Sequence, residues 1–323
     1  MKTVVLFDPS IRSLNMGDHI IMKSAKDELK EIISDKFLIH CATHQPPVTC
    51  YQNTRLNPKI KIYDDAQFKF ICGSNLLWKN LMIPRPTFNV NLFNTKIYEN
   101  SILMGVGTNS SNKNANLYTR IIYNRILSEK FYHSVRDERT KRFVESLGFK
   151  AINTGCPTMW KFNKEFCKQI PTHKSSKVVF TLTDYSQEQR EDQELINILV
   201  KNYEKVYFWL QGASDEEYFD SLANTKGIIK VAPTLEAYEA ILNEGDIDYV
   251  GTRLHAGMYA MQHKVRTIIL AIDNRVRDMK ETYHINTVER TDINSLDSLV
   301  NSTITTQISI NENNINEWMS QFK

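Results

Sequence analysis

Short apolar runs and longer amphipathic segments alternate along the first half of the chain. Apolar positions that recur near every 3.6 residues predict helices at 19–33, at 117–127, and from Asp137 to a stop at Gly148. The short runs predict strands at residues 4–8, 37–41, 60–63, 68–72, 102–106, 133–136 and 151–154. Strands that alternate with helices in this way are typical of βαβ units and a parallel sheet.

The same alternation begins again after residue 176. Helices are predicted at 189–201, from Thr234 to Asn243 and from Gly251 to Gln262, with a last helix within 309–323. The strands of this half are predicted at residues 177–183, 206–211, 228–232, 249–250 and 266–272. The almost unbroken apolar run at 266–272 is typical of a parallel strand that is buried on both faces.

Residues 158–175 separate the two series, and their weak periodicity and several lysines indicate a connector. We therefore expect an α/β protein in which two Rossmann-like domains face a cleft. The N-terminal domain, 1–157, is predicted to take the acceptor side, and the C-terminal domain, 176–323, the donor side, with the last helix free to pack back on the first domain. Ligands of such sheets bind beyond the carboxyl ends of the strands, which directs attention to the residues there.

Composition and charge restrict the classes of molecule that the protein can bind. Lys and Arg number 40 against 37 Asp and Glu, which leaves a net charge of +3 over 323 residues. Without a basic stripe this balance argues against nucleic acid, and any bound anion must be held by a few placed cations. No run reaches the roughly 18 apolar residues of a membrane span. The 5 scattered cysteines are expected to be reduced thiols in the cytoplasm.

Two candidate sites lie in the first half. In Asn15-Met16-Gly17-Asp18, between the first strand and the first helix, Gly17 allows close approach of a ligand and Asp18 begins the helix. A plain helix cap explains Asp18 equally well. Arg136 ends a strand just before a helix, where a guanidinium and the helix N-terminus can together hold a phosphate or carboxylate. The alternative is a surface arginine paired with a neighbouring acid.

Two further candidates lie in the second half. In Gly251-Thr252-Arg253-Leu254-His255, a cap by Thr252 would place His255 in the first helical turn, where a bound phosphate would favour the protonated imidazole. A histidine that only packs there is the alternative. Asp273-Asn274-Arg275 follows the most buried strand and fits either a ligand-facing loop or a plain turn.

Other motifs are weak or missing. His40, Cys41, His44 and Cys50 do not have the paired spacing of a zinc site. The pair Gly105 and Gly107 lacks the third glycine of a dinucleotide fingerprint. The chain has neither a nucleophile elbow nor a phosphate loop that ends in Gly-Lys-Ser/Thr.

In their order and spacing the four candidate stretches resemble the polysaccharide pyruvyl transferase family, from Asn15 to about Arg275. The resemblance implies a fold like that of the two-domain GT-B glycosyltransferases. It implies transfer of the pyruvate unit of phosphoenolpyruvate onto two hydroxyls of a sugar in a surface or exopolysaccharide precursor, with release of phosphate. It also places Asp18, Arg136 and Arg253 in the active site together with His255.

The chemistry of this reaction needs those residue types. The donor carries a carboxylate and a phosphate, which arginine forks hold bidentately. A general acid must protonate the C3 methylene and a base must take the hydroxyl proton, and Asp18 and His255 from facing domains can share these roles in either order. We thus expect His255, Asp18 and Arg136 to be catalytic, and no metal or organic cofactor. Substrate binding is expected from Arg253, Asn15, Gly17, Leu254, Asn274 and Arg275.

The chain departs from the family pattern at four places. Cys72-Gly73-Ser74-Asn75 stands where three glycines are frequent, a difference that concerns the acceptor pocket more than the chemistry. Arg275 stands where lysine is common and keeps the positive charge. Cys156 replaces an acid before Pro157, and Thr140 replaces a serine.

Two other functions stay open. A GT-B glycosyltransferase that uses a nucleotide-sugar would share the fold, because fold does not fix function. A non-catalytic glycan-assembly or sugar-binding protein would not need the acid and base. If the acceptor is lipid-linked, the protein would work at the inner face of the cytoplasmic membrane without a span in it. Formation of a homo-oligomer is left open.

Overall fold

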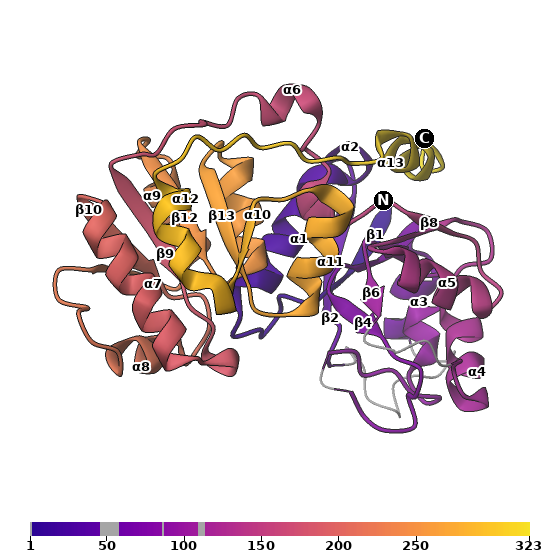
Figure 1. The fold of residues 1–323 in the computed structure, drawn as a ribbon. Coiled ribbons are helices and arrows are strands. Elements are labelled where there is room, and N and C mark those ends of the chain that lie inside the picture. Colours follow the sequence, from indigo (N-terminus) through magenta and orange to yellow (C-terminus); the bar gives the residue numbers. More distant parts are fainter. Residues whose placement is uncertain (1, 46–57, 86, 109–113) are drawn as a thin grey trace. The chain divides into compact units, whose positions relative to one another are not determined.

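The computed structural model describes residues 2–45, 58–85, 87–108 and 114–323 (Figure 1). Contacts between residues group the chain into two units, each with its own parallel sheet. The first unit comprises Met1–Ser13, Ile21–Trp160 and Asn311–Lys323, and the second comprises Leu14–Ile20 and Lys161–Ile310. The α/β class with two Rossmann-like sheets is therefore confirmed. The assignment of acceptor and donor sides to them stays a prediction.

A four-stranded parallel sheet forms the centre of the first unit, in the order β2-β1-β3-β5. Its strands lie on the predicted apolar runs, with ends that differ by one or two residues: β1 (Thr3–Asp8), β2 (Phe37–Ala42), β3 (Phe68–Cys72) and β5 (Ile102–Met104). Two short parallel pairs accompany the sheet, β4 (Asn75–Leu77) with β6 (Gly107–Thr108) and β7 (His133–Val135) with β8 (Ala151–Asn153). The carboxyl ends of these strands lead into the loops that carry the polar candidates.

The helices that lie wholly or partly in the first unit are α1 (Met16–Glu28), α2 (Lys30–Ile33), α3 (Pro58–Asp64), α4 (Leu117–Ile126), α5 (Glu138–Ser146) and α13 (Glu312–Ser320). Short 3-10 turns lie at Thr95–Tyr98 and Pro157–Met159. Asp137 caps α5 as predicted, because its carboxylate accepts the backbone N–H of Thr140 at 2.7 Å.

The strand predicted at 60–63 is wrong, because these residues lie in α3. Ile60 and Tyr63 are buried whereas Ile62 is exposed, a spacing of three that suits one face of a helix. Four apolar residues are too few for periodicity to separate the two structures.

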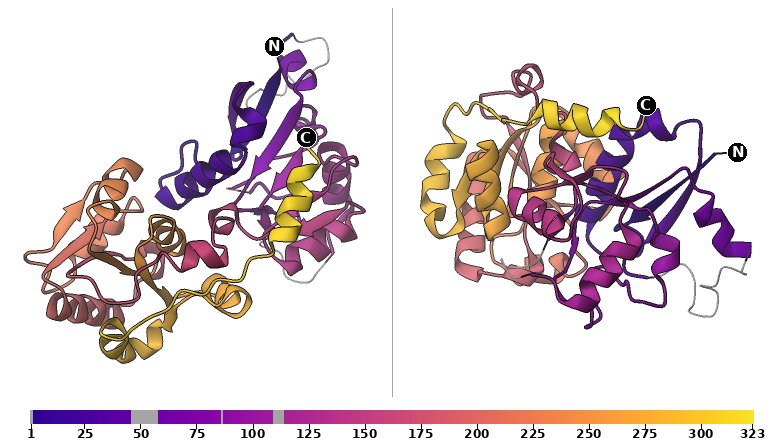
Figure 2. Two further views of the ribbon diagram at one scale, coloured as in Figure 1. Left: turned by 90° about the horizontal axis from the view of Figure 1, so that it is seen from above. Right: turned by 90° about the vertical axis from the view of Figure 1, so that its right-hand side faces the viewer.

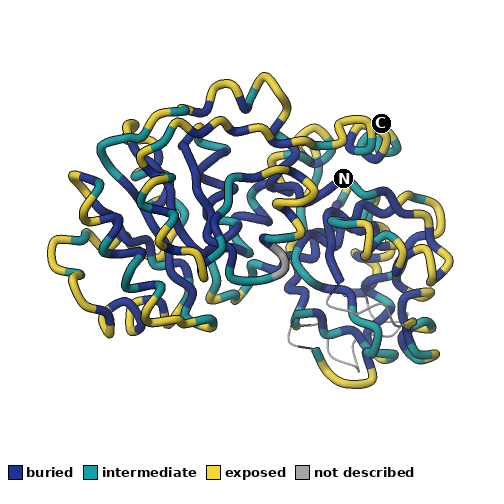
Figure 3. The backbone as a smooth tube through the Cα atoms, in the orientation of Figure 1, coloured by how far each residue is buried: buried dark blue, intermediate teal, exposed yellow. Residues whose placement is uncertain are grey.

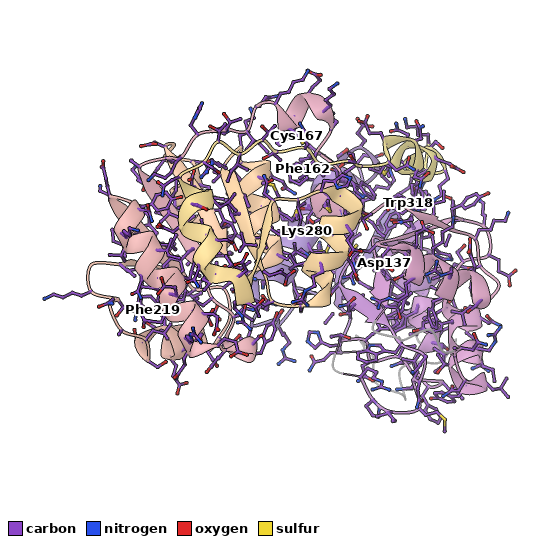
Figure 4. All side chains as sticks on the ribbon, in the orientation of Figure 1. Asp137, Phe162, Cys167, Phe219, Lys280 and Trp318 are labelled. Atoms are coloured by element: carbon purple, nitrogen blue, oxygen red, sulfur yellow. The ribbon has the colours of Figure 1, made fainter. Side chains whose placement is uncertain are left out.

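The last helix belongs to the first unit (Figure 2). The ring of Trp318, labelled in Figure 4, packs edge-on against Phe70 of β3 and against Trp160. Its indole N–H donates to the carbonyl of Tyr132 at 2.8 Å, and Phe322 also contacts Phe70. α13 therefore covers apolar surface of a sheet made more than 200 residues earlier in the sequence.

The second unit contains a six-stranded sheet in the order β11-β10-β9-β12-β13-β14, and every pair in it is parallel. The strands are β9 (Lys177–Thr181), β10 (Lys205–Trp209), β11 (Ile229–Val231), β12 (Ile247–Gly251), β13 (Arg266–Ala271) and β14 (Thr287–Glu289). Chain order reverses between β9 and β12, and this reversal is the place where doubly wound sheets bind ligands. All residues of β13 are buried, as predicted (Figure 3).

The helices of this unit are α6 (Lys164–Cys167), α7 (Gln189–Asn202), α8 (Asp215–Asp220), α9 (Leu235–Leu242), α10 (Leu254–Gln262), α11 (Asn274–Tyr283) and α12 (Leu296–Val300). Further 3-10 turns lie at Asp184–Ser186 and Arg290–Ser295. Buried side chains of α7 and α12 share one apolar core with β9, β10 and β13. Helix α11 was not predicted: a loop was expected at Asn274, where the helix begins.

Candidate functional site

The candidate residues form two clusters, one in each unit. The cluster of the first unit surrounds Arg136, which follows β7 directly. Its backbone N–H donates to the carbonyl of Val106 at 3.1 Å, and its guanidinium Nη2 donates to the side-chain oxygen of Asn75 at 2.6 Å. Its Nε lies 3.4 Å from a carboxylate oxygen of Asp137, the residue that caps α5 (Figure 4). The arginine is thus partly buried beside a helix N-terminus, a position suited to an anion.

Gly107 makes room for the contact between Arg136 and Asn75, and Gly73 shapes the turn that leads to Asn75. A Cβ on Gly107 would lie 2.6 Å from Cζ of Arg136. Gly73, with a φ of 31°, turns the chain between β3 and β4, and a Cβ there would lie 2.2 Å from Cγ2 of Ile21. Asn75 was not predicted as a partner of Arg136, although its place shortly after the buried strand β3 was a usable signal.

The cluster of the second unit lies where strand order reverses, at the carboxyl ends of β9 and β12. The hydroxyls of Thr183 and Thr252 lie 2.8 Å apart across the two strand ends. The predicted cap by Thr252 is wrong, because α10 begins at Leu254 and Arg253 precedes it without a side-chain cap bond. The Thr252 hydroxyl is used between the strands instead, so the first turn of α10 has no capping side chain.

Arg253 is the most constrained of the predicted site residues, with 4% of its side chain exposed. Its Nε donates to the carbonyl of Leu182 at 2.8 Å, and its Nη2 contacts the carboxylates of Asp184, at 2.9 Å, and Asp215. Asp215 is fully buried and also accepts the backbone N–H of Gly212 at 2.6 Å. The guanidinium charge is therefore balanced by two carboxylates, and the residue joins the loops after β9, β10 and β12.

His255 is the second residue of α10 and is partly exposed. The helix below it is held closely, since a Cβ on Gly257 would lie 2.7 Å from Cδ1 of Ile269 in β13. Tyr238 of α9 donates its hydroxyl to the carbonyl of Ala256 at 3.0 Å. The imidazole is thus carried by a rigid helix start rather than by a mobile loop.

Residues 14–20 belong by contact to the second unit. The side-chain oxygen of Asn15 accepts the backbone N–H of Gly17 and the amide Nε2 of Gln211, each at 3.0 Å. Met16 donates its backbone N–H to the carbonyl of Gln211 at 2.9 Å. A Cβ on Gly17 would lie 3.0 Å from the Gln211 amide, which explains the glycine. Asp18 follows in the first turn of α1 and is partly exposed.

A continuous chain of contacts therefore links two of the predicted stretches of the second unit. Asn15 binds Gln211, the backbone N–H of Gln211 donates to Asp215 at 3.0 Å, and Asp215 binds Arg253. Asp18 and His255 were predicted to lie in facing domains, whereas the contacts place both in one unit. Gln211 and Asp215 were not predicted, although Gln211 lies shortly after β10 and Asp215 is the first residue of α8.

The last predicted stretch is described only in its backbone at two positions. Asn274 and Arg275 form the first turn of α11, and their side chains lie outside the described residues. Asp273 accepts the backbone N–H of Val276 at 3.3 Å, as a helix-capping residue does.

No metal site is found among the described residues, where no three His, Cys, Asp or Glu side chains converge on one point. Cys50, one of the zinc candidates weighed above, lies outside the part of the chain that the structure describes. Within that same part, no helix is long and apolar enough to cross a membrane.

Family comparison identifies the class of protein. The family model described as Polysaccharide pyruvyl transferase matches residues 15–274, a span that includes every candidate stretch up to Asn274. The chain therefore belongs to the polysaccharide pyruvyl transferase family, a family of transferases. A comparison with curated protein sequences returned no match.

Solved structures support the fold alone. The UDP-GlcNAc 2-epimerase from Methanocaldococcus jannaschii is 11% identical with a TM-score of 0.57, and the match covers 99% of each chain. The UDP-GlcNAc 2-epimerase from Neisseria meningitidis, solved bound to UDP-GlcNAc, is 12% identical with a TM-score of 0.51, over 99% of this chain and 100% of that chain. The predicted GT-B-like architecture is therefore confirmed.

Proposed function

We propose that this protein transfers the pyruvate unit of phosphoenolpyruvate onto two hydroxyls of one sugar in a polysaccharide precursor, forming a cyclic ketal and releasing phosphate. One observation carries the proposal. The motifs of the matched family coincide with strand ends and helix starts, and the Asn15–Gln211–Asp215–Arg253 chain ties two of these motifs together.

Arg136 is proposed to bind the anionic donor. Its Nη2 contacts the neutral amide of Asn75 and its Nε lies 3.4 Å from the carboxylate of Asp137, while the α5 N-terminus adds partial positive charge beside it. Arg253 is proposed to act differently from the sequence-based expectation. Because Asp184 and Asp215 already balance its charge, it supports the donor by fixing the start of α10 rather than by offering a free fork. Asn15, Gly17 and Leu254 are proposed to border the substrate.

Asp18 and His255 are proposed as the acid and base, in either order. In one assignment of the roles, His255 protonates C3 of the donor. Asp18 takes the proton of the attacking sugar hydroxyl while the hydroxyl oxygen bonds to C2. The C2–O bond to phosphate then breaks, its electron pair leaves with phosphate, and phosphate departs with the proton held on Asp18. The second hydroxyl closes the ketal ring at C2 and returns its proton to His255, which restores both groups.

The proposal is tested by phosphate release from phosphoenolpyruvate in the presence of galactose, glucose and mannose glycosides. We expect release that requires one of the acceptors, with a product heavier than the acceptor by the pyruvate unit. Release of UDP or GDP from nucleotide-sugars with the same acceptors, and none of phosphate from phosphoenolpyruvate, would replace the proposal by the glycosyltransferase. No turnover of either donor would favour the non-catalytic glycan-binding protein.

A further inference from the structure

Four large apolar side chains of the first unit, on two neighbouring segments, are exposed to solvent. The exposed fractions are 67% for Met82, 55% for Ile83, 74% for Leu117 and 38% for Ile121. We name these four residues the α4 patch. Single exposed apolar residues need no explanation, but a group on one surface marks a binding face.

Hydrogen bonds join the two segments that carry the α4 patch. The side chain of Asn116, which caps α4, binds the side chain of Asn80 at 3.0 Å. The backbone N–H of Leu81 donates to the hydroxyl of Thr119 at 2.8 Å. Met82 and Ile83 therefore lie next to the first turn of α4, where Leu117 and Ile121 follow one another on one helix face.

The surroundings of the α4 patch are basic. The two segments that carry it, residues 79–85 and 114–126, contain no acid and include the cations Lys79, Arg85, Arg120 and Arg125. Arg85 lies over the ring of Trp78 with its Nε on the carbonyl of Asn80, and Arg120 donates to the carbonyl of Ser146. These partners are neutral, so the contacts leave the two positive charges uncompensated.

We propose that the α4 patch docks on a membrane surface that contains anionic lipids. Aliphatic side chains ringed by cations match the acyl boundary and the charged headgroups of such a surface. A second copy of the chain fits less well, because two copies would bring like charges together. A free anionic glycan offers nothing apolar for the four aliphatic side chains. The proposal goes beyond the transfer reaction and does not depend on it.

Vesicle flotation of the full chain tests the docking. We expect binding to vesicles of phosphatidylcholine mixed with phosphatidylglycerol, little binding to phosphatidylcholine alone, and loss of binding at high salt. Leu117→Ser with Ile121→Ser should weaken binding about tenfold or more, because burial of each side chain is lost. Arg120→Gln should weaken it about fivefold.

Matched controls come from the second unit, where Val200 and Ile229 are also exposed. Val200→Ser and Ile229→Ser should leave vesicle binding unchanged, and all variants should keep wild-type melting temperatures because no core residue changes. Phosphate release with a soluble acceptor should survive the α4 patch variants, which separates this proposal from the proposed function. Absence of binding to the anionic vesicles would overturn it, as would a dimer in solution that Leu117→Ser with Ile121→Ser dissolves.

Discussion

Arg253 belongs to a family motif, yet its guanidinium is bound by other groups of the protein itself. Its guanidinium contacts Leu182, Asp184 and Asp215, which come from loops after two different strands. Breaking a buried ion pair typically costs about 3–5 kcal/mol, because the remaining charge keeps its desolvation without its partner. The residue therefore fixes the geometry of the strand ends before any substrate arrives.

A lysine cannot replace this fork. Arg253→Lys should lose the bond to Leu182 and one of its carboxylate contacts, so that the melting temperature and the affinity for phosphoenolpyruvate fall together. Asp215→Asn should produce the same paired loss if Arg253 acts by positioning. Differential scanning calorimetry and donor titration measure both quantities. Loss of donor affinity in Arg253→Lys alone, with normal behaviour of Asp215→Asn, would return Arg253 to direct donor binding.

His255→Asn tests the proton carrier. Since general acids and bases contribute typically ~10²–10⁴-fold to rate, kcat should fall by at least about two orders of magnitude. The affinity for phosphoenolpyruvate should stay near wild type, because the helix start and Arg253 are unchanged. Steady-state kinetics paired with calorimetric binding gives the split. A variant with near-normal kcat would make His255 a packing residue of α10.

At the scale of elements, prediction succeeded where a strand is buried on both faces and failed where a segment is short or where a long-range hydrogen bond sets the structure. β13 could be predicted because an unbroken apolar run is typical of a strand that is buried on both faces. α3 was misread because four residues at 60–63 carry too little periodicity. The predicted cap by Thr252 was wrong because its hydroxyl bonds to that of Thr183. Thr183 is 69 residues away in the sequence, and local sequence patterns cannot predict such a contact.

The contact between β5 and β7 depends on a neutral histidine. Nδ1 of His133 accepts the N–H of Leu103 at 3.1 Å and Nε2 lies 3.0 Å from the carbonyl of Ser128. Burial lowers the pKa of His133 to about 4, against the opposing effect of the bond to Ser128. The unfolded chain, with a histidine pKa near ~6.5, then binds more protons than the folded chain between these values.

Stability should therefore be lost as pH falls through this window. Between pH 7 and pH 5 we expect about 2 kcal/mol less free energy of unfolding from His133 alone. Urea unfolding at both pH values measures it, and His133→Gln should show a smaller difference between them. An equal pH dependence in the wild type and the variant would assign the loss to other groups.

At the scale of the whole molecule, the sequence predicted most motif positions but not their grouping. Gly17 and Asp18 were correctly singled out after the first strand, yet their attachment to Gln211 depends on a contact between residues 196 positions apart. Arg136 was recognised from its place between strand and helix, whereas its partner Asn75 needed the turn at Gly73 and Ser74. Long-range hydrogen bonds of this kind leave no periodic signal in a single sequence.

Donor binding should stabilise the whole fold. A ligand that binds only the folded chain adds about 2.7 kcal/mol at a concentration one hundred times its Kd, so phosphoenolpyruvate should raise Tm measurably. Arg136→Ala should abolish the shift, while Arg139→Ala, a change on α5 outside the cluster, should keep it. Thermal scans with and without donor decide this. A larger shift with UDP-sugars than with phosphoenolpyruvate would contradict the donor assignment.

The return of α13 to the first unit has a consequence for biosynthesis. A ribosome delivers Phe70 early, but Trp318 and Phe322, which cover its ring, emerge only after the whole of 161–310 has been made. The apolar face around Phe70 therefore stays uncovered during synthesis of the second unit. Such an exposed apolar face is a natural binding site for a chaperone. A chain ended at residue 310 should stay in that state and collect in the insoluble fraction, whereas supplying α13 as a separate peptide should recover part of it in solution.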